Sequence, residues 1–98
     1  MEKTTLVVMA VPNPNEMASV QSYLKGVLPL LKEAGGRLVK RLKVDRLILG
    51  KPSGMVLVMD FDSADAITAM FESDGYAALV PARDRGFTEM NIQLTQEM

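Results

Sequence analysis

Two segments of the chain are apolar on both faces of an extended backbone, and this feature constrains the fold most. From Leu6 onward, every side chain of Thr4–Val11 is apolar, although side chains of a strand alternate between two faces. Met55–Phe61 repeats the pattern over its first five residues. Strands of this kind need cover on both faces. Leaving about five such side chains in water would forgo roughly 2 kcal/mol each, which rivals the stability of a typical domain.

A long helix is expected after the first strand. Asn13 is a favoured cap and Pro14 suits the first helical position. One apolar stripe follows at spacings of three and four residues, formed by Met17, Val20, Leu24, Val27, Leu28 and Leu31. Gly35-Gly36 ends the helix, because glycine accepts the left-handed conformation found at many helix ends.

Two further strands and a second helix complete the predicted order. Arg37–Leu49 alternates and predicts a strand, bent near Val44-Asp45 and joined to the Met55 strand as a hairpin. Ser63 is expected to cap the second helix. Phe87–Leu94 alternates as the last strand, with its even-numbered residues facing inward.

The predicted order is β-α-β-β-α-β, the ferredoxin-like arrangement of the α+β class, in one domain over residues 1–98. Both helices would then cover one face of an antiparallel sheet. A second copy of the sheet is the simplest cover for the other face, so we expect a homodimer packed through its sheet faces. A doubly wound sheet would need more helices than the sequence offers.

The absence of cysteine and histidine excludes most catalytic and metal-binding templates. Thiolate nucleophiles, thiolate metal sites and the commonest general base are all missing, so we expect no metal and no cofactor. The apolar run Leu6–Val11 is too short to span a membrane, and a net charge of −1 does not attract nucleic acid. We therefore expect a cytoplasmic protein without nucleic-acid or membrane partners.

Arg41 and Asp60 form the first candidate pair. Alternation places Arg41 opposite to Leu38 and Leu42, on the inter-subunit face of the sheet. Asp60 is expected on that face too, because its neighbours in the strand face the helices, and the hairpin would put the two nearly opposite one another. A charged pair in an apolar space costs desolvation, so it either fixes the register of the dimer or anchors an anionic or carbonyl ligand.

The stretch "FESDGYAALVPARD" (Phe71–Asp84) predicts a helix that is broken and restarted. Gly75 is expected to end the second helix. Tyr76 and Arg83 then share one face of a short helical piece that Pro81 can kink. Either Tyr76 plugs the core while Arg83 pairs with a carboxylate, or both side chains line a ligand site.

Two longer matches and several local features carry a family resemblance. The matches are "LPLLKEAGGRLVKR" (Leu28–Arg41) and "MVLVMDFDSADAITAMFESDGYAALVPAR" (Met55–Arg83). The local features fall on Gly35-Gly36, Arg41, Asp60-Phe61, Ser73, Tyr76 and Arg83. With the opening strand they cover nearly the whole chain, which resembles the dimeric α/β-barrel superfamily and, within it, the bacterial domain-of-unknown-function family numbered thirteen-thirty. The resemblance implies the fold and dimerisation, without an established reaction.

Three functions are compatible with these residues. The first is a homodimer that binds a small anionic or carbonyl-containing ligand in a cleft by the inter-subunit sheet face, lined by Arg41, Asp60, Tyr76 and Arg83. The second, implied by the resemblance, is a cofactor-independent isomerase, decarboxylase or monooxygenase at the same cleft. The third is a non-catalytic dimer whose ion pairs are only structural.

Overall fold

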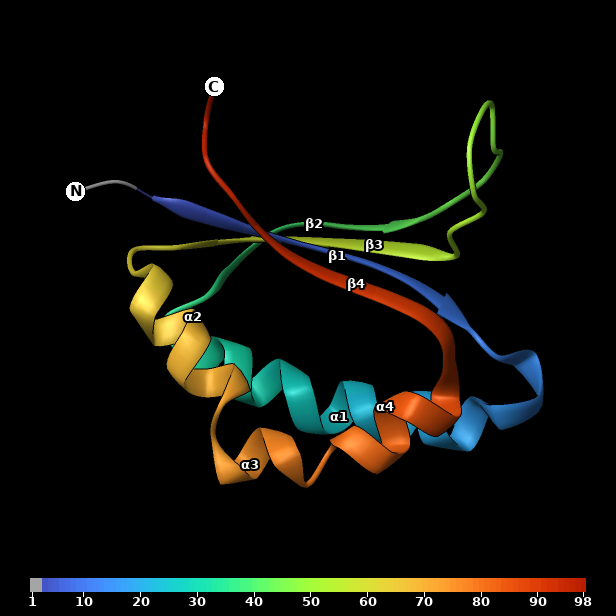
Figure 1. The fold of residues 1–98 in the computed structure, drawn as a ribbon, viewed down its shortest axis with the longest axis horizontal. Helices are drawn as coiled ribbons and strands as arrows, with labels where there is room; N and C mark the ends of the chain where they lie inside the picture. The colour runs from blue at the N-terminus through green and yellow to red at the C-terminus, as the bar shows by residue number, and fades with distance from the viewer. Residues whose placement is uncertain (1–2) are drawn as a thin grey trace.

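The computed structural model describes residues 3–98 as a four-stranded antiparallel sheet with all helices on one side (Figure 1). The elements are β1 (Thr4–Pro12), the 3-10 helix η1 (Pro14–Glu16), α1 (Met17–Glu33), β2 (Arg37–Lys43), β3 (Met55–Phe61), α2 (Ala64–Phe71), α3 (Asp74–Ala77), α4 (Val80–Gly86) and β4 (Phe87–Thr95). The strand order is β2-β3-β1-β4, and the sheet is open. This confirms the predicted ferredoxin-like α+β fold.

The ends of α1 follow from local chemistry. The Asn13 side chain accepts a hydrogen bond from the Asn15 N–H at 3.0 Å, but it heads the 3-10 turn rather than α1 itself. At the other end, Gly35 has a φ of +94°, the left-handed conformation predicted for this position. The buried stripe of α1 differs from the predicted one. Met17 is 45% exposed, whereas Tyr23, which the prediction left out, is buried.

The core lies between the helices and the sheet. On β1 and β3, most of the side chains that point to the helices are almost inaccessible, as in Leu6, Met59 and Phe61. The core is closed tightly where α1 passes into β2. A Cβ atom on Gly36 would lie 2.6 Å from Cζ of Phe61, so only glycine fits at this junction.

The second strand is shorter than predicted. It ends at Lys43 rather than at Leu49, and residues 44–54 form a loop that rises on the side of the sheet away from the helices (Figure 1). Two backbone hydrogen bonds of 2.9 Å close its base, from Val44 N–H to the Gly54 carbonyl and from Gly54 N–H to the Ala10 carbonyl. Side-chain alternation suggested a strand here, but β3 offers no backbone partner beyond this point.

Two register shifts change which side chains face the core. In β2, the pairing moves from Leu38–Met59 to Lys40–Val58, which leaves Val39 as the extra residue of a bulge. In β4, a shift beside Pro12 leaves Phe87 buried and Thr88 exposed. The inward position predicted for Thr88 is therefore wrong. A slip of one residue reverses the facing of every residue beyond it.

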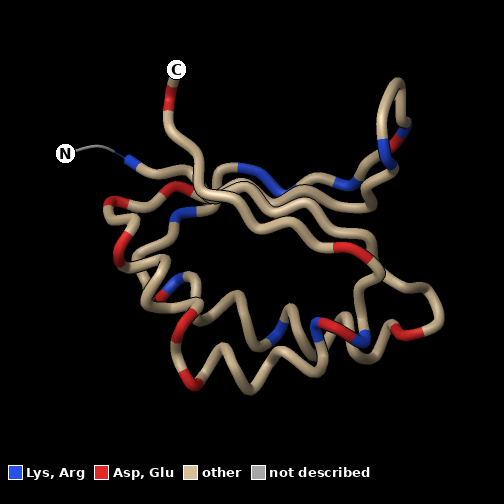
Figure 2. Tube along the Cα trace, viewed as in Figure 1, with Lys and Arg blue, Asp and Glu red and all other residues tan. Residues whose placement is uncertain are grey.

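The sheet face away from the helices is apolar at its centre. By the strand register it carries Val7, Met9, Val11, Val56 and Val58, together with polar residues of the edge strands. Within the sheet, Figure 2 shows charged positions on β2 and toward the strand ends, and Asp60 is the one charged residue within β1 and β3. We call this surface the open face. Within residues 3–98, no helix is long and apolar enough to cross a membrane.

Candidate functional site

Ser73 shapes the chain between α2 and α3. Its hydroxyl donates to the Met70 carbonyl at 2.6 Å and accepts from the Tyr76 N–H at 3.2 Å, so one side chain joins the end of α2 to the start of α3. The prediction that Gly75 ends the helix is therefore wrong. α2 ends at Phe71, and Gly75 lies inside α3. The break was predicted in the right place, but the serine cap produces it.

Two tyrosines meet in the core below this break. The hydroxyl oxygens of Tyr23, on α1, and Tyr76, on α3, lie 2.9 Å apart, and the side chains are 4% and 3% exposed. Arg83, on α4, donates from Nη1 to the Tyr76 hydroxyl at 3.2 Å. The sequence did contain a signal for Tyr23, because Val20, Tyr23 and Val27 have the spacing of a helix face.

A close approach of α4 to α1 positions the arginine. A Cβ atom on Gly86 would lie 2.8 Å from the backbone nitrogen of Val20, so the glycine lets the two helices come together. The Arg83 side chain is 29% exposed, and its Nε atom also donates to Oδ1 of Asp84 at 3.1 Å. The guanidinium group is thus held from two sides at the edge of the core.

The protonation states of this network follow from burial and hydrogen bonding. Burial, followed by the hydrogen bond with Tyr76, raises the pKa of Tyr23 above its ordinary value. The hydrogen bond with Tyr76 raises the pKa of Arg83, against the opposing effect of burial. At neutral pH Tyr23 is therefore a neutral phenol and Arg83 a cation.

Arg83 stands between two grooves that flank β4. The first, of about 380 Å³, is lined by Ile67, Thr68, Phe71, Glu72, Tyr76, Arg83, Ile92 and Leu94. The second, of about 500 Å³, is lined by Arg83, Asp84, Phe87, Thr88, Glu89, Met90 and Ile92. A third cavity lies within the core and is apolar, but its volume of about 30 Å³ has room for about one water molecule. The grooves beside β4 are therefore spaces of ligand size that contain a charged donor.

Asp60 and Arg41 do not face one another. The register pairs Asp60 with Arg37, and Arg41 with Leu57, so the predicted opposition of Arg41 and Asp60 is wrong. The register of the pair sets this separation, since Arg37 rather than Arg41 lies opposite Asp60. The bulge at Val39 changes the facing as well, because it turns Arg41 to the face that Leu57 shares with the core. Arg41 is exposed on β2, at the edge of the sheet opposite to β4.

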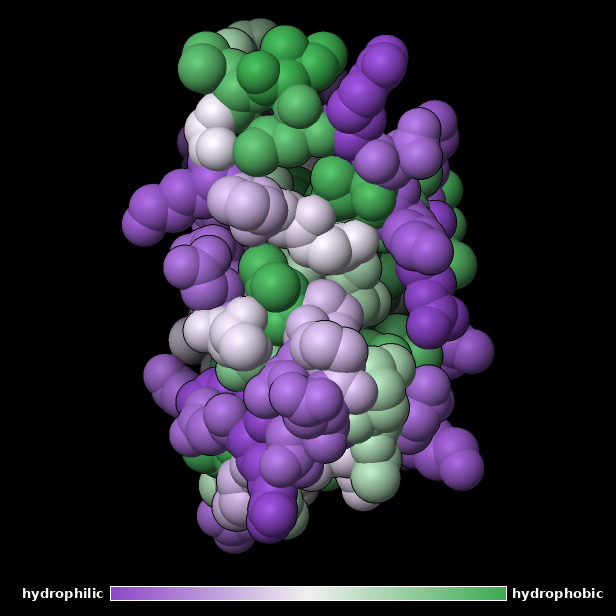
Figure 3. Space-filling model, turned by 90° about the vertical axis from the view of Figure 1, so that its right-hand side faces the viewer, coloured by the Kyte–Doolittle hydropathy of each residue, from purple (hydrophilic) through white to green (hydrophobic). Residues whose placement is uncertain are grey.

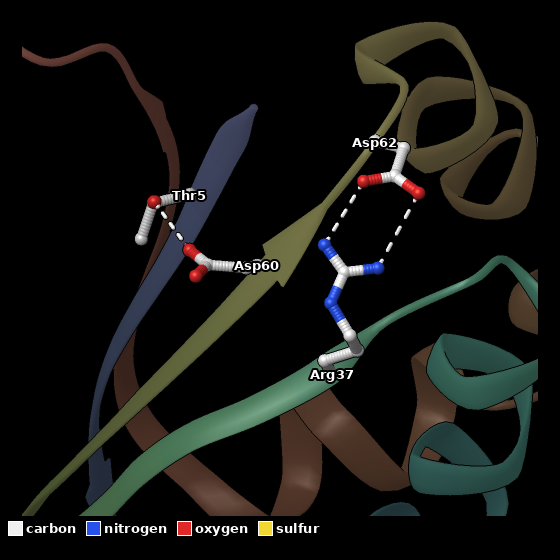
Figure 4. Close-up of polar contacts among 4 residues, drawn as sticks. All are labelled: Thr5, Arg37, Asp60 and Asp62. Atoms are coloured by element: carbon white, nitrogen blue, oxygen red, sulfur yellow. Dashed lines mark hydrogen bonds and ion pairs between the residues drawn. The ribbon is translucent and has the colours of Figure 1, made fainter. Parts of the chain in front are cut away.

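Two separate polar contacts take the place of that pair (Figure 4). Asp60 accepts a hydrogen bond from the Thr5 hydroxyl at 2.6 Å on the open face. Arg37 binds Asp62 through two nitrogens, at 2.9 and 3.4 Å, and this contact lowers the pKa of the Asp62 carboxyl. The side chains of that ion pair are 50% and 66% exposed, so it contributes little to stability.

Of the four predicted site residues, the structure brings Tyr76 and Arg83 together, and it adds Tyr23. The predicted convergence with Arg41 and Asp60 does not occur within one chain, since Asp60 lies on the open face and Arg41 on the far edge strand. In the part of the chain that the structure describes, no three acidic residues are grouped so that they could hold a metal ion.

The raised pKa of Tyr23 leads to a prediction about alkaline stability. The folded state binds the phenol proton of Tyr23 more tightly than the unfolded state does. The contribution of Tyr23 to the free energy of unfolding is therefore complete below about pH 10 and is lost as the pH rises further. The free energy of unfolding should therefore fall above about pH 10, by up to about 1.4 kcal/mol per pH unit from this group. Urea denaturation of the wild type and Tyr23→Phe between pH 8 and 11 measures the effect.

The variant should show a shallower decline over the same range, since every other titrating group is shared. Removing the hydroxyl should also lower stability at pH 8 by about 1 kcal/mol, because Tyr76 loses a buried partner. Equal slopes for the two proteins would contradict the proposed protonation of Tyr23 in the folded state.

Solved structures with the same fold come from several bacteria. A protein of unknown function from Rhodopseudomonas palustris has a TM-score of 0.84 at 13% identity, covering 99% of this chain and 83% of its own. A dimeric protein of unknown function with a ferredoxin-like fold, from Bacteroides fragilis, has a TM-score of 0.63 at 10% identity, with 97% and 96% covered. A putative antibiotic biosynthesis monooxygenase from Bordetella bronchiseptica has a TM-score of 0.69 at 16% identity, with 100% and 99% covered.

At these identities the likeness shows the fold alone, and no reaction follows from it. No curated protein matches the sequence. The sequence does match one family model, described as Domain of unknown function (DUF1330), over residues 4–98. Since the match covers nearly the whole chain, this protein belongs to the DUF1330 family.

Proposed function

We propose that this protein binds a small anionic or carbonyl-containing ligand in the grooves beside β4, with Arg83 as the charged contact. The observation that carries the proposal is the state of the Arg83 guanidinium. Two of its nitrogens are held by Tyr76 and Asp84, while Nη2 forms no hydrogen bond or ion pair with any residue of the described range. An arginine fixed in this way keeps a donor for a carboxylate or carbonyl oxygen.

The surroundings of Arg83 favour a compact ligand with an apolar part. The groove of about 380 Å³ lies within the usual range of small-molecule sites, which is about 300–1,000 Å³. Beyond Arg83 its walls are largely aliphatic and aromatic, with contributions from Phe71 and Ile92. A short hydrocarbon tail would pack on these walls while its polar head contacts the guanidinium group.

Tyr76 would orient the head group of such a ligand. Its hydroxyl oxygen accepts the hydrogen bond from Arg83, and it can accept a second one from Tyr23. In that arrangement the Tyr76 proton is available for a ligand oxygen. A phenol and a guanidinium side by side would then bind one oxygen-bearing group.

These groups suit binding better than proton abstraction. Tyr23 has a raised pKa and stays protonated at neutral pH, so it acts as a hydrogen-bond donor rather than as a base. The alternative of a cofactor-independent enzyme makes a distinct prediction. Turnover of small enols or phenols by the wild type and its loss in Tyr76→Phe would favour catalysis over simple binding.

The ligand proposal can be tested with hexanoate, which combines a carboxylate with a short apolar tail. Hexanoate added to ¹⁵N-labelled protein should shift the amide signals of α4 and β4, and Arg83→Met should weaken binding about tenfold or more. Arg85→Met is the matched control, because Arg85 lies on the same helix but is 71% exposed and paired with Glu16. Hexanol should bind more weakly, since it lacks the anion.

Equal affinities of wild type and Arg83→Met for hexanoate, in folded proteins, would remove Arg83 from the proposal. The same holds if the shifted amides lie away from α4 and β4. Loss of folding in Arg83→Met would instead assign the arginine a structural role, as an anchor for Tyr76.

We also infer that two copies of the chain pack through their open faces. The support is physical, because Val7, Met9, Val56 and Val58 form an apolar surface that no helix of the described chain covers. The related fold from Bacteroides fragilis is described as dimeric, in agreement with this inference. Sheet-to-sheet packing would turn two open sheets into a closed α/β barrel.

A further inference from the structure

We propose that the loop of residues 44–54 is an arm that packs against the second copy of the chain; this inference rests on the proposed homodimer. The tip of the loop is strongly apolar and unprotected. Ile48 and Leu49 are 92% and 91% exposed, and Leu47 is 46% exposed. Three adjacent aliphatic side chains in water are unusual in a folded monomer and mark an interaction surface.

The arm has a firm base. One backbone hydrogen bond, from Val44 N–H to the Gly54 carbonyl, closes the base of the arm, and a second, from Gly54 N–H to the Ala10 carbonyl, ties that base to β1. A Cβ atom on Gly54 would lie 2.7 Å from the ring of Pro12, so the chain is also closely packed there. The base of the arm is therefore fixed on the sheet beside β1.

The direction of the arm indicates its partner. Figure 1 shows the loop rising from the end of β2 and β3 on the helix-free side of the sheet, which is the side of the open face. Figure 3 shows apolar side chains gathered at the top of the molecule, where this loop lies. A second copy packed on the open face would stand next to the tip.

The apolar surface of the open face reaches the base of the arm at Leu42. Leu42, the penultimate residue of β2, pairs with Val56 on the open face and is 46% exposed. The arm begins two residues later, at Val44. One partner covering the open face would therefore also cover the tip, and a second copy of this chain is the partner that both surfaces share.

Basic residues flank the tip and suggest a competing occupant. Arg46 and Lys51 lie on either side of the three aliphatic residues, an arrangement that also suits an anionic membrane surface. The position of the tip beside the open face favours the second copy. Membrane binding is treated as an outcome of the experiment.

The chain has no cysteine, so a single introduced thiol is a unique labelling site. Ile48→Cys protein without ¹⁵N, carrying a nitroxide on the new thiol, is mixed with ¹⁵N-labelled wild type to form mixed dimers. Signals of the ¹⁵N subunit should broaden, because the label of one subunit lies against the other. Lys25→Cys, exposed on α1 in the helix layer, is the matched control and should broaden fewer signals of the partner.

A second measurement uses the double variant Ile48→Ser, Leu49→Ser without any nitroxide. Its dimer dissociation constant should rise about tenfold or more over that of the wild type, with the fold retained. A stable dimer with neither intersubunit broadening nor a weaker association in this variant overturns the arm and leaves the dimer intact.

Two other outcomes are distinguishable. A wild type that stays monomeric at high micromolar concentration overturns the dimer itself, and the arm with it. A monomer that binds vesicles of phosphatidylserine and phosphatidylcholine, and loses this binding in the double serine variant, assigns the tip to a membrane instead.

Discussion

Replacing Val58 with aspartate is expected to convert the proposed dimer into folded monomers. Val58 pairs with Val7 at the centre of the open face, so the new carboxylate would be buried between two sheets without a partner. The dimer dissociation constant should rise about a hundredfold or more, which corresponds to roughly 3 kcal/mol. Sedimentation velocity at micromolar concentration should change from twice the 10.7 kDa chain mass to the single-chain mass.

Two control variants separate dissociation from unfolding. Ala69→Asp, exposed on α2 in the helix layer, should remain dimeric. Val8→Asp should unfold the chain, because Val8 packs against the core on the other face of the same sheet. Circular dichroism should show a native spectrum for Val58→Asp. A Val58→Asp protein that still sediments as a dimer would refute packing through the open face.

Truncating Phe61 to alanine should lower the free energy of unfolding by about 3–5 kcal/mol. Its ring is fully buried and contacts the junction between α1 and β2 at Gly36, where the backbone leaves little freedom to fill the cavity. Urea denaturation at one fixed protein concentration measures the loss, since the stability of a dimer depends on concentration.

Gln21→Ala, on the exposed side of α1, is the reference for a surface change and should alter stability by less than about 0.5 kcal/mol. A loss for Phe61→Ala as small as that of the reference would mean that the core rearranges around the missing ring. That result would contradict the tight junction at Gly36.

Local patterns were enough to predict the fold. The apolar stripe of α1, the run of β3 that is apolar on both faces and the caps at Ser63 and Gly35 each depend on residues that are close in the chain. Side-chain periodicity reports which side of an element meets the core, and the order of the elements then leaves few topologies. The same reasoning placed Tyr76 and Arg83 on one side of the chain, and they do meet.

Register could not be predicted in the same way. The pairing of β2 with β3 sets Arg37 opposite Asp60, and the bulge at Val39 turns Arg41 to the helix side of the sheet. The alternation of β2 is nearly the same with or without the bulge, because all seven of its residues are exposed and burial does not select one facing.

By itself, the sequence determined the order of the elements, the face of β3 that meets the helices, and the family. Only the tertiary structure decided the contacts between distant residues. Tyr23 and Tyr76 are 53 positions apart, and their hydrogen bond depends on the packing of α3 against α1. Such a pair leaves no periodic signal, because its geometry is set by where whole elements come to rest. The candidate site depends on that geometry, and the fold does not.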